Sequence, residues 1–368
     1  MDIIEKNILL ICISFLVSFL ITYISIPSII KVSKLKNLCD LPDDDRRVHK
    51  NVTPTLGGIA VFAGFVISLL FFVDSTDFQE LKFLLISVII LFFVGIKDDI
   101  LMIAPWTKMF LQIIAAFILV VFGRVQITDF HGFFNIHEIP QFIGIPFSVL
   151  IFIVLINAIN FIDGIDGLSA TIGIIITSAF GFWFFLIGEY SFVFVAVALV
   201  GSLVAFLKFN LFDVENKIFI GDTGTLIMGL VIAFLAIEFN QKNLELEQSS
   251  AFYILPAPAV TFGILIIPLF DFLRIIYIRL IIRKPLFSPD KRHLHHLFLN
   301  LGFSHIKTVI ILGTTNIFFI LISFWLSEFV TIKRLLLLLI LSIIGLSMLP
   351  KFIIDLKNKR NEKKNISK

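Results

Sequence analysis

Two aspartates and two asparagines stand in the segment 157–168, NAINFIDGIDGL, which apolar runs enclose on both sides. Carboxylates where a membrane helix ends are costly unless they meet a cation, a partner or water, so they mark a functional site by default. Asn157, Asn160, Asp163 and Asp166 recur every third residue, which aligns them along one face if the segment is helical. We interpret them as groups that meet a polar substrate or cation. The alternative is a helix-end turn rich in Asp and Gly.

A second pair of acids, Asp98 and Asp99, ends another apolar run in VGIKDDI. Adjacent carboxylates repel each other, so the pair suggests a divalent cation or a cationic partner. Lys108 follows, and its ammonium group could contact phosphate. A solvated helix terminus is the alternative for the acids.

Asp222 lies in KIFIGDTGTLIMG, where a Gly-Asp-x-Gly-Thr turn opens an apolar run. Such a turn offers backbone N–H groups and the positive end of a helix dipole to an anion. The carboxylate is equally suited to Mg²⁺ or to a simple N-cap role. Asn210, in the preceding KFN, is a weaker polar candidate.

Three histidines, His293, His295 and His296, lie with Lys291 and Arg292 in SPDKRHLHHLF. This concentration of donors suits phosphate or sugar hydroxyls. A zinc site and a plain basic loop are the alternatives, although no HExxH motif or cysteine pair supports zinc.

A further basic stretch, RRVHKNVTPTLGG at 46–58, includes Lys50 beside Pro and Gly residues. It could bind an anionic headgroup at the membrane surface. Charge that only sets the membrane orientation would explain it equally well.

Composition shows what must position these groups. The 368 residues are 58% hydrophobic and 15% charged, with a mean hydropathy of +1.02. Soluble domains are less apolar and more charged, so the chain is an integral membrane protein. Two cysteines give no disulfide framework, and a net charge of +3 gives no reason to expect nucleic acid. The motif signatures of ATP-driven transport are missing from the sequence.

The expected fold is an all-α, polytopic bundle of ten to eleven membrane helices with a small external hairpin at 123–141. The first span lacks the basic region and cleavage site of a signal peptide and reads as a retained helix. One membrane domain covers 1–355, and a basic tail covers 356–368. Roughly 20 residues cross a bilayer, and apolar stretches near that length lie at 8–30, 57–73, 81–97, 107–122, 142–160, 167–187, 190–207, 223–238, 251–282, 307–328 and 333–354.

Most of the 30 Lys and Arg residues fall on one side of these spans. The positive-inside rule places that side in the cytoplasm, with the N-terminus outside and the C-terminus inside. Nearly all candidate residues share it, in the segments 31–56, 98–106, 157–167, 208–222 and 283–306. A cation-coupled transporter with Asp98, Asp163 and Asp222 as relay acids is the alternative from another class. Its polar groups should run through the midplane instead.

The motifs TPTLGG, KDD, NAINFIDGIDGL, FN with FIGDTGT, and SPDKRHLHHLF follow one another across 46–303. In this order they resemble the polyprenyl-phosphate N-acetylhexosamine-1-phosphate transferases of glycosyltransferase family 4. The resemblance implies a bacterial inner-membrane enzyme with its site facing the cytoplasm. It would move a sugar 1-phosphate from a UDP-sugar to undecaprenyl phosphate with Mg²⁺, or Mn²⁺ as a substitute, and release UMP.

Within the family, HLHH after SPDKR is similar to the branch that uses UDP-GlcNAc for O-antigen, enterobacterial common antigen or teichoic acid. FucNAc and QuiNAc donors occur among such relatives, and the peptidoglycan phospho-MurNAc-pentapeptide transferase is the alternative enzyme. The LFDVENK stretch after Asn210 is slightly longer than in the family pattern.

The resemblance also implies residue roles. Asp98, Asp99 and Asp163 would be catalytic, and Asp222 with Asp99 would hold the metal. Direct displacement and a covalent two-step route through Asp163 both stay open. A homodimer is one assembly that the sequence allows. The residues expected to bind the substrates are Lys50, Lys108, Asn157, Asn160, Asp166, Asn210, Arg279, His293, His295 and His296.

Overall fold

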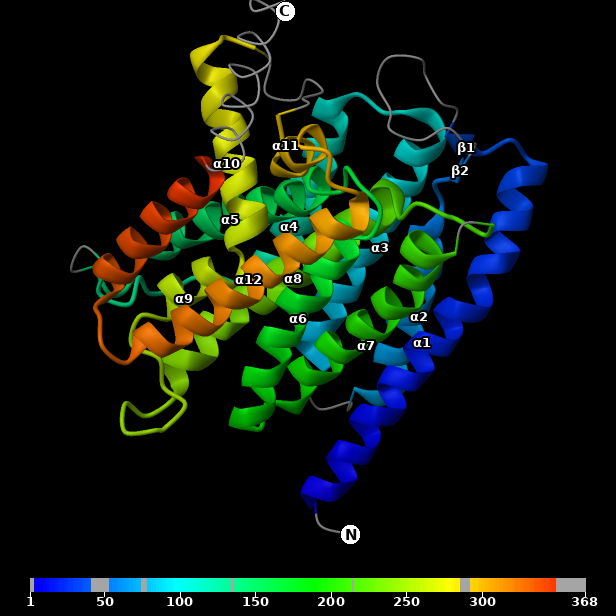
Figure 1. The fold of residues 1–368 in the computed structure, drawn as a ribbon. Coiled ribbons are helices and arrows are strands. Elements are labelled where there is room, and N and C mark those ends of the chain that lie inside the picture. The colour runs from blue at the N-terminus through cyan, green and yellow to red at the C-terminus, as the bar shows by residue number, and fades with distance from the viewer. Residues whose placement is uncertain are drawn as a thin grey trace, which may run out of the picture.

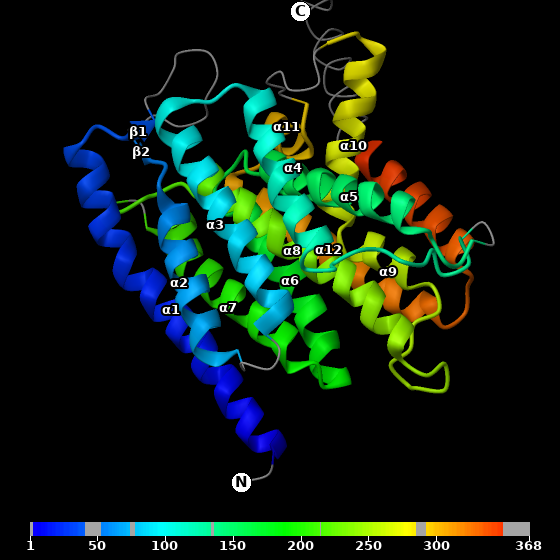
Figure 2. The same ribbon diagram turned by 180° about the vertical axis from the view of Figure 1, so that it is seen from behind.

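The computed structural model is almost entirely helical, with its helices packed side by side (Figure 1; Figure 2 shows the reverse side). The N-terminus lies at one end of the bundle. The short helix α11 and the small strands β1 and β2 lie at the opposite end. The predicted substrate residue Lys50, Lys291 and the basic tail fall outside the residues that the structure describes. The structure describes residues 3–40, 53–73, 78–133, 136–213, 215–284 and 292–348.

The described residues form the twelve α-helices α1 to α12, one short π-helix and a further helix over 332–348. The π-helix η2, Lys208–Phe212, directly continues α7. The α-helices are α1 (Ile3–Leu35), α2 (Gly57–Phe72), α3 (Phe78–Leu101), α4 (Pro105–Val121), α5 (Gln141–Phe161), α6 (Leu168–Ile187), α7 (Tyr190–Leu207), α8 (Gly221–Glu245), α9 (Ala257–Ile264), α10 (Ile266–Ile281), α11 (Leu294–Asn300) and α12 (His305–Ser327).

Six helices in the described part of the chain are long and apolar enough to cross a membrane, and α9 with α10 would make seven as one bent span. The six correspond to α1, α5, α6, α7, α8 and α12. This confirms the expectation of an all-helical, multi-pass membrane protein. The other predicted spans coincide with α2 and α4, which are shorter, with the more charged α3, and with the helix at 332–348.

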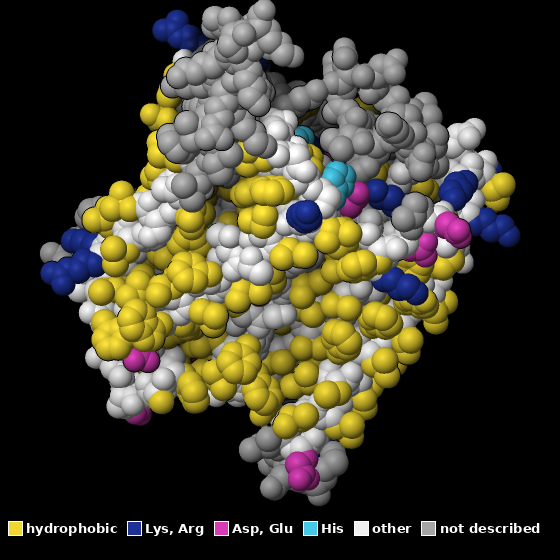
Figure 3. Space-filling view, viewed as in Figure 1, with side chains coloured by type: hydrophobic (Ala, Val, Ile, Leu, Met, Phe, Trp, Pro, Cys, Tyr) yellow, Lys and Arg dark blue, Asp and Glu magenta, His cyan; other side chains and the backbone are white. Residues whose placement is uncertain are grey.

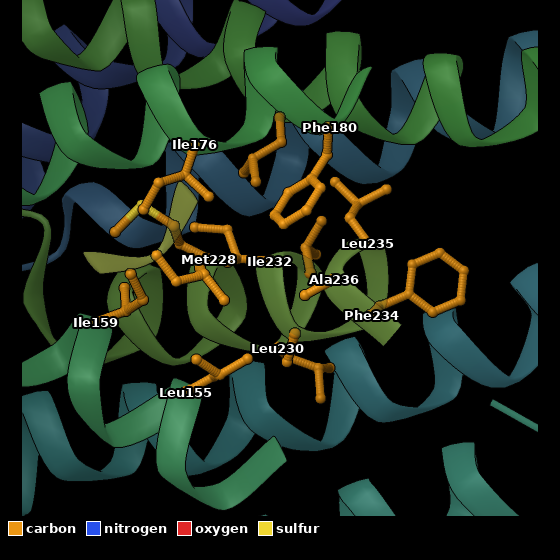
Figure 4. Close-up of a cluster of buried hydrophobic side chains, with 14 of the residues drawn as sticks. Leu155, Ile159, Ile176, Phe180, Met228, Leu230, Ile232, Phe234, Leu235 and Ala236 are labelled. Atoms are coloured by element: carbon orange, nitrogen blue, oxygen red, sulfur yellow. The ribbon is translucent and has the colours of Figure 1, made fainter. Parts of the chain in front are cut away.

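Helix α8 forms the centre of the bundle. Its 25 residues are apolar on nearly every side, and almost all of its most apolar stretch is buried. A helix that is hydrophobic all round belongs in a core. Figure 4 shows Leu155 of α5 beside Leu230 of α8, and Ile176 of α6 beside Met228 of α8.

Glycines bring two neighbouring backbones against the first turn of α8. A Cβ on Gly58 of α2 would lie 2.2 Å from the Gly224 nitrogen, and one on Gly95 of α3 would lie 2.3 Å from Thr223 Cα. Small residues permit such close helix approach in membranes. The start of α8, where Asp222 lies, is therefore fixed by backbone packing.

The TPTLGG motif is joined to the segment that precedes α8. Strand β2 (Thr53–Pro54) pairs antiparallel with β1 (Cys39–Asp40). The Phe219 N–H donates to the Pro54 carbonyl at 2.8 Å, and the Gly57 N–H donates to the Phe219 carbonyl at 2.9 Å. These bonds connect two segments, 31–56 and 208–222, that the sequence analysis placed on the same side of the membrane.

The long apolar run at 251–282 is broken rather than continuous. Helices α9 and α10 meet at an angle of 81°. Pro268 has no N–H to donate to the carbonyl four residues earlier, that of Ile264, which disrupts the helix there. Asn316 of α12 donates to this carbonyl at 3.2 Å. The bend turns α10 toward the end of the bundle that carries α11 (Figure 1).

The hairpin predicted at 123–141 is present in reduced form. A single antiparallel bridge links Asp129 and Glu138, and Ile139 donates to the Thr128 carbonyl at 2.8 Å. The segment therefore folds back on itself with one bridge in place of two regular strands.

Candidate active site

Asp222 lies in the first turn of α8 and contacts groups from two other helices. Lys108 of α4 places its Nζ 2.8 Å from Asp222 Oδ1. Asn160 of α5 donates to the same oxygen and, at 2.8 Å, to Thr225 Oγ1. One carboxylate oxygen thus joins α4, α5 and α8.

Asp99, at the end of α3, caps the start of α8. Its Oδ1 accepts from the Asp222 N–H at 2.7 Å, and its Oδ2 accepts from the Thr223 N–H at 3.0 Å and hydroxyl at 2.5 Å. A carboxylate at a helix N-terminus satisfies otherwise unpaired N–H groups and complements the helix dipole. Gly221, with φ of +66°, leaves room for it, since a Cβ there would lie 2.7 Å from both oxygens. Asp99 therefore positions the backbone of Asp222.

Asp98, the other acid of the pair, points to a different partner. Its Oδ1 accepts from the Ile103 N–H at 2.8 Å, and its Oδ2 lies 3.0 Å from Lys108 Nζ. Lys108 therefore bridges Asp98 and Asp222, and its side chain is only 15% exposed. The structure brings together these two acids, which lie more than a hundred residues apart in the sequence.

Asp163 lies in the loop between α5 and α6, beside this network. Its Oδ1 accepts from Ser169 Oγ at 2.5 Å. Its side chain is exposed to solvent, and many protein atoms nevertheless surround the carboxyl group. Desolvation, reinforced by the charges of Asp222 and Asp99, raises the pKa of its carboxyl to about 7.

Asp166 and Asn210 fasten this loop to other segments. Asp166 Oδ2 lies 2.7 Å from Lys217 Nζ and 2.7 Å from Nδ1 of His305, the first residue of α12. Asn210 accepts from the Gly167 N–H at 2.5 Å and donates to the Ile218 carbonyl at 2.8 Å. Asn210 thus ties the α5–α6 loop to the segment before α8, which gives it a visible structural role.

Asn157 lies one helical turn before Asn160 and is buried. It donates to Gln112 Oε1 of α4 and to the Ile153 carbonyl, both at 2.8 Å. Its contacts join α5 to α4, and its expected role in substrate binding stays a prediction.

His293 is held by a buried acid of α10. Asp271, only 1% exposed, places its Oδ2 2.8 Å from His293 Nδ1. Its Oδ1 accepts from the Leu294 N–H at 2.9 Å and from Arg274 at 3.2 Å. Arg274 also donates to the Arg292 carbonyl. Asp271 therefore joins α10 to the start of α11.

Phe161, at the end of α5, links the histidines to the acids. The His293 ring meets it edge-on with 5.9 Å between centroids, and Arg279 lies over it at 5.7 Å. Phe161 directly follows Asn160, the partner of Asp222. The histidine segment and the acidic network thus share one end of α5.

His295 rests on the α5–α6 loop. A Cβ on Gly164 would lie 2.1 Å from His295 Nε2, so only glycine admits the ring. His295 stacks against His293 at 5.5 Å and lies 4.3 Å from His296. Burial lowers the pKa of His295 to about 3, so its ring is neutral at physiological pH. On the face shown in Figure 3, the visible histidine side chains lie toward this end beside acidic and basic side chains, other charged side chains lie at the left edge and at the bottom, and hydrophobic side chains cover the middle.

The acids suit Mg²⁺ that is shared with a substrate. Among the described residues, no group of three or more His, Cys, Asp or Glu side chains could hold a metal alone. Mg²⁺ often binds through one or two carboxylates plus substrate phosphates. Asp222 and Asp98 offer such oxygens, and the Lys108 ammonium between them shows that this place favours positive charge. These residues therefore fit a Mg²⁺ ion that is held by one or two carboxylates together with the phosphates of the substrate.

Several residues of the site were missed at the level of sequence. Asp271 is an acid inside an apolar run, which is the signal that could have found it. The others are hydroxyl, lysine and histidine side chains; the two threonines lie in the GDTGT motif, which drew attention to Asp222 alone, and the rest have no distinctive motif. They are Ser169, Thr223, Thr225, Lys217 and His305.

Comparison with known proteins supports the family resemblance that the sequence motifs indicated. The family description "Glycosyl transferase family 4" matches residues 81–240. A Salmonella typhimurium protein named undecaprenyl-phosphate alpha-N-acetylglucosaminyl 1-phosphate transferase is 30% identical over 292 residues, covering 78% of this chain and 76% of its own. The Escherichia coli K12 protein of that name is 27% identical over 280 residues, covering 74% and 72%. A Bacillus subtilis protein named probable undecaprenyl-phosphate N-acetylglucosaminyl 1-phosphate transferase is 27% identical over 340 residues, covering 89% of each chain.

Proposed function

This chain belongs to glycosyl transferase family 4, and we propose that it transfers N-acetylhexosamine 1-phosphate, in particular GlcNAc 1-phosphate, from a UDP-sugar to undecaprenyl phosphate. UMP is the other product. The lipid-linked sugar would begin an O-antigen, a teichoic acid or a related cell-surface glycan. The observation that carries the proposal is the bridge from Lys108 to Asp98 and Asp222, which sets one cation between two carboxylates. The names of the relatives support the donor and the acceptor.

We also propose the finer membrane arrangement. The chain crosses the bacterial inner membrane eleven times, with its N-terminus outside and its C-terminus and site in the cytoplasm. Support comes from the distribution of Lys and Arg. It also comes from the common end of the bundle at which α11, β1 and β2 lie (Figure 1).

The reaction is a direct displacement. An oxygen of the lipid phosphate attacks the β-phosphorus of the UDP-sugar, the bond from this phosphorus to the bridging oxygen breaks, and UMP leaves with that oxygen. A phosphate monoester has its second pKa near ~6, so the attacking oxygen needs no dedicated base near neutral pH. Positioning and charge neutralisation then provide most of the catalysis.

The acidic network orients the reacting phosphates. Lys108 neutralises the charge of the lipid phosphate. Asp98 holds the Lys108 ammonium group in place and thereby orients that phosphate. Asp222 would hold Mg²⁺, which when bound supplies positive charge to the pyrophosphate. The contacts of Asp99 with the first turn of α8 favour a positioning role, in which it keeps Asp222 in place. Asp163 supplies a further carboxylate beside them.

The remaining residues bind the donor. Asn160 and Asp166 contact the uridine side, and Arg279, His293 and His296 contact the pyrophosphate and sugar. His295, which is neutral because of its burial, suits a hydroxyl or amide of the sugar better than a phosphate charge.

A donor panel tests the proposal. The purified protein receives undecaprenyl phosphate and Mg²⁺ with UDP-GlcNAc, UDP-GalNAc, UDP-FucNAc, UDP-QuiNAc or UDP-MurNAc-pentapeptide, and UMP release is measured. We expect UDP-GlcNAc to give the highest kcat/KM and omission of the lipid to stop UMP release. Preference for UDP-MurNAc-pentapeptide would assign the peptidoglycan reaction instead. Substrate uptake by reconstituted vesicles without UMP release would support the transporter.

A further inference from the structure

Asp271 is a buried acid that the proposed reaction does not use. It lies on α10 after the 81° bend and is 1% exposed. Its carboxylate has hydrogen-bond partners in His293, Leu294 and Arg274. An acid in the apolar part of a membrane protein is a functional candidate by default.

The partners of Asp271 determine which nitrogen of His293 carries a proton. The Leu294 N–H and the Arg274 guanidinium can only donate, and both meet Oδ1, so they favour the ionised carboxylate. Oδ2 of an ionised carboxylate can only accept, and it lies 2.8 Å from His293 Nδ1. Nδ1 must therefore carry the proton.

The contact with Asp271 engages Nδ1 and not the other ring nitrogen, Nε2. In a neutral imidazole with its proton on Nδ1, Nε2 is an acceptor. Phe161 meets the ring edge-on and His295 stacks on it with an angle of 6° between the planes, so neighbours on two sides restrict its rotation. The Leu294 N–H bond to Asp271 also fixes the backbone that carries the ring.

We propose that Asp271 is a positioning residue that fixes the Nδ1–H tautomer of His293 and presents Nε2 as an acceptor to a hydroxyl or amide N–H of the donor sugar. This assignment rests on the proposed transferase function. A partner that fixes the tautomer and orientation of a histidine is a recurring device in enzymes.

Asp271→Asn tests the assignment because the amide is nearly the same size. Its NH₂ group can face His293 and donate, which favours the tautomer with the proton on Nε2. We expect kcat/KM for UDP-GlcNAc to fall by about tenfold, the lower end for loss of such a supporting partner and no more than the loss expected when His293 itself is removed. The matched control is Asp213→Asn, because Asp213 lies in a loop and its side chain accepts from Asn216, away from the residues of the site. It should keep wild-type kcat/KM.

A double-mutant cycle separates positioning from a general structural effect. If Asp271 acts through His293, Asp271→Asn should change kcat/KM little when His293 is already Ala. Effects that multiply in the double variant would overturn the assignment.

A spectroscopic measurement decides the tautomer without any turnover. The histidine ¹⁵N signals of the wild-type protein, with those of His293 identified by their loss in His293→Ala, should show a protonated Nδ1 and an unprotonated Nε2. The reverse pattern would overturn the proposal even if Asp271→Asn fails to fold. A wild-type protein that releases no UMP from any donor would defeat the proposed function, and the ¹⁵N result would still decide the state of His293.

Discussion

The acidic half of the site and its histidine half are attached to the protein in different ways. The acidic half comprises Asp98, Asp99, Lys108, Asn160 and Asp222. The histidine half comprises Asp271, Arg279, His293, His295 and His296. The first is built on helices whose backbones touch at Gly58 and Gly95. The second lies on a bent helix and on the seven-residue helix α11, which side chains hold in place.

This difference indicates a division of labour. Reacting groups need placement within a fraction of an ångström, and backbone packing around α8 provides it. Recognition groups on α10 and α11 contact the rest of the site through Phe161 and Gly164. We expect variants of the charged residues of the acidic half to affect turnover, and variants of the histidine half to affect binding of the donor.

The largest effect is expected from Asp222→Asn. Loss of the charge that Lys108 and Asn160 contact should lower kcat for UMP release by about 10³-fold, the upper range for a preorganised charge-stabilising group. Asp213→Asn is the control, and both variants should insert into membranes like wild type. Wild-type kcat in Asp222→Asn would remove this residue from the reaction.

Asp99→Asn should reduce both turnover and stability. An amide keeps only one acceptor oxygen and sets an NH₂ group against the donors of Asp222 and Thr223, leaving a buried donor unpaired at a cost of about 1–3 kcal/mol. A small displacement of reacting groups costs about 10²-fold in rate. We expect a lower thermal midpoint as well as a lower kcat. If the midpoint stays at the wild-type value and only kcat falls, Asp99 contacts the reacting groups and its capping role is secondary.

Gly164→Ala tests the contact between the two halves. The new Cβ would overlap the His295 ring, which is 2% exposed and has little room to move. We expect kcat/KM for UDP-GlcNAc to fall by about tenfold or more as α11 is displaced. Gly345→Ala is the matched control, because no atom lies within 4 Å of a Cβ there. Equal kinetics for the two variants would show that the reaction does not depend on the contact between the His295 ring and Gly164 of the α5–α6 loop.

His293→Ala should act mainly on the donor. Loss of one hydrogen bond to the donor corresponds to an increase in KM of about tenfold. The measurement is UMP release as a function of UDP-GlcNAc concentration. An unchanged KM together with a strongly reduced kcat would move His293 from recognition to the chemical step.

The smallest effect concerns pH and Asp163. Its folded-state pKa is raised from 3.8 to about 7. Its contribution to stability is therefore fully present below about pH 4, the pKa of an unfolded Asp, and is lost as pH rises through 7. Asp163→Asn removes this dependence. The difference in thermal midpoint, variant minus wild type, should rise from pH 5 to pH 8 in metal-free buffer. A constant difference would show that Asp163 has an ordinary pKa.

The sequence predicted the acidic half better than the histidine half. Apolar runs of spanning length located the helices, and their alternation placed Asp98 and Asp222 at the same end. The structure adds that Asp99 caps the start of α8 by accepting from the N–H of Asp222, 123 residues later in the chain, which no local pattern could show. The bend at Pro268 was visible only as a proline in a long run. The pairing of Asp271 with His293 depends on that bend, so it required the tertiary structure.

The most direct test of the account is a double-label transfer experiment. The donor is UDP-GlcNAc with ³²P at the β-phosphate and ¹⁴C in the sugar, and the acceptor is undecaprenyl phosphate with Mg²⁺. We predict that both labels enter the lipid fraction in a 1:1 ratio, with one UMP released per lipid formed, and that Asp222→Asn abolishes both. Carbon label in the lipid without phosphorus label, or no lipid label with any UDP-sugar tested, would contradict the account.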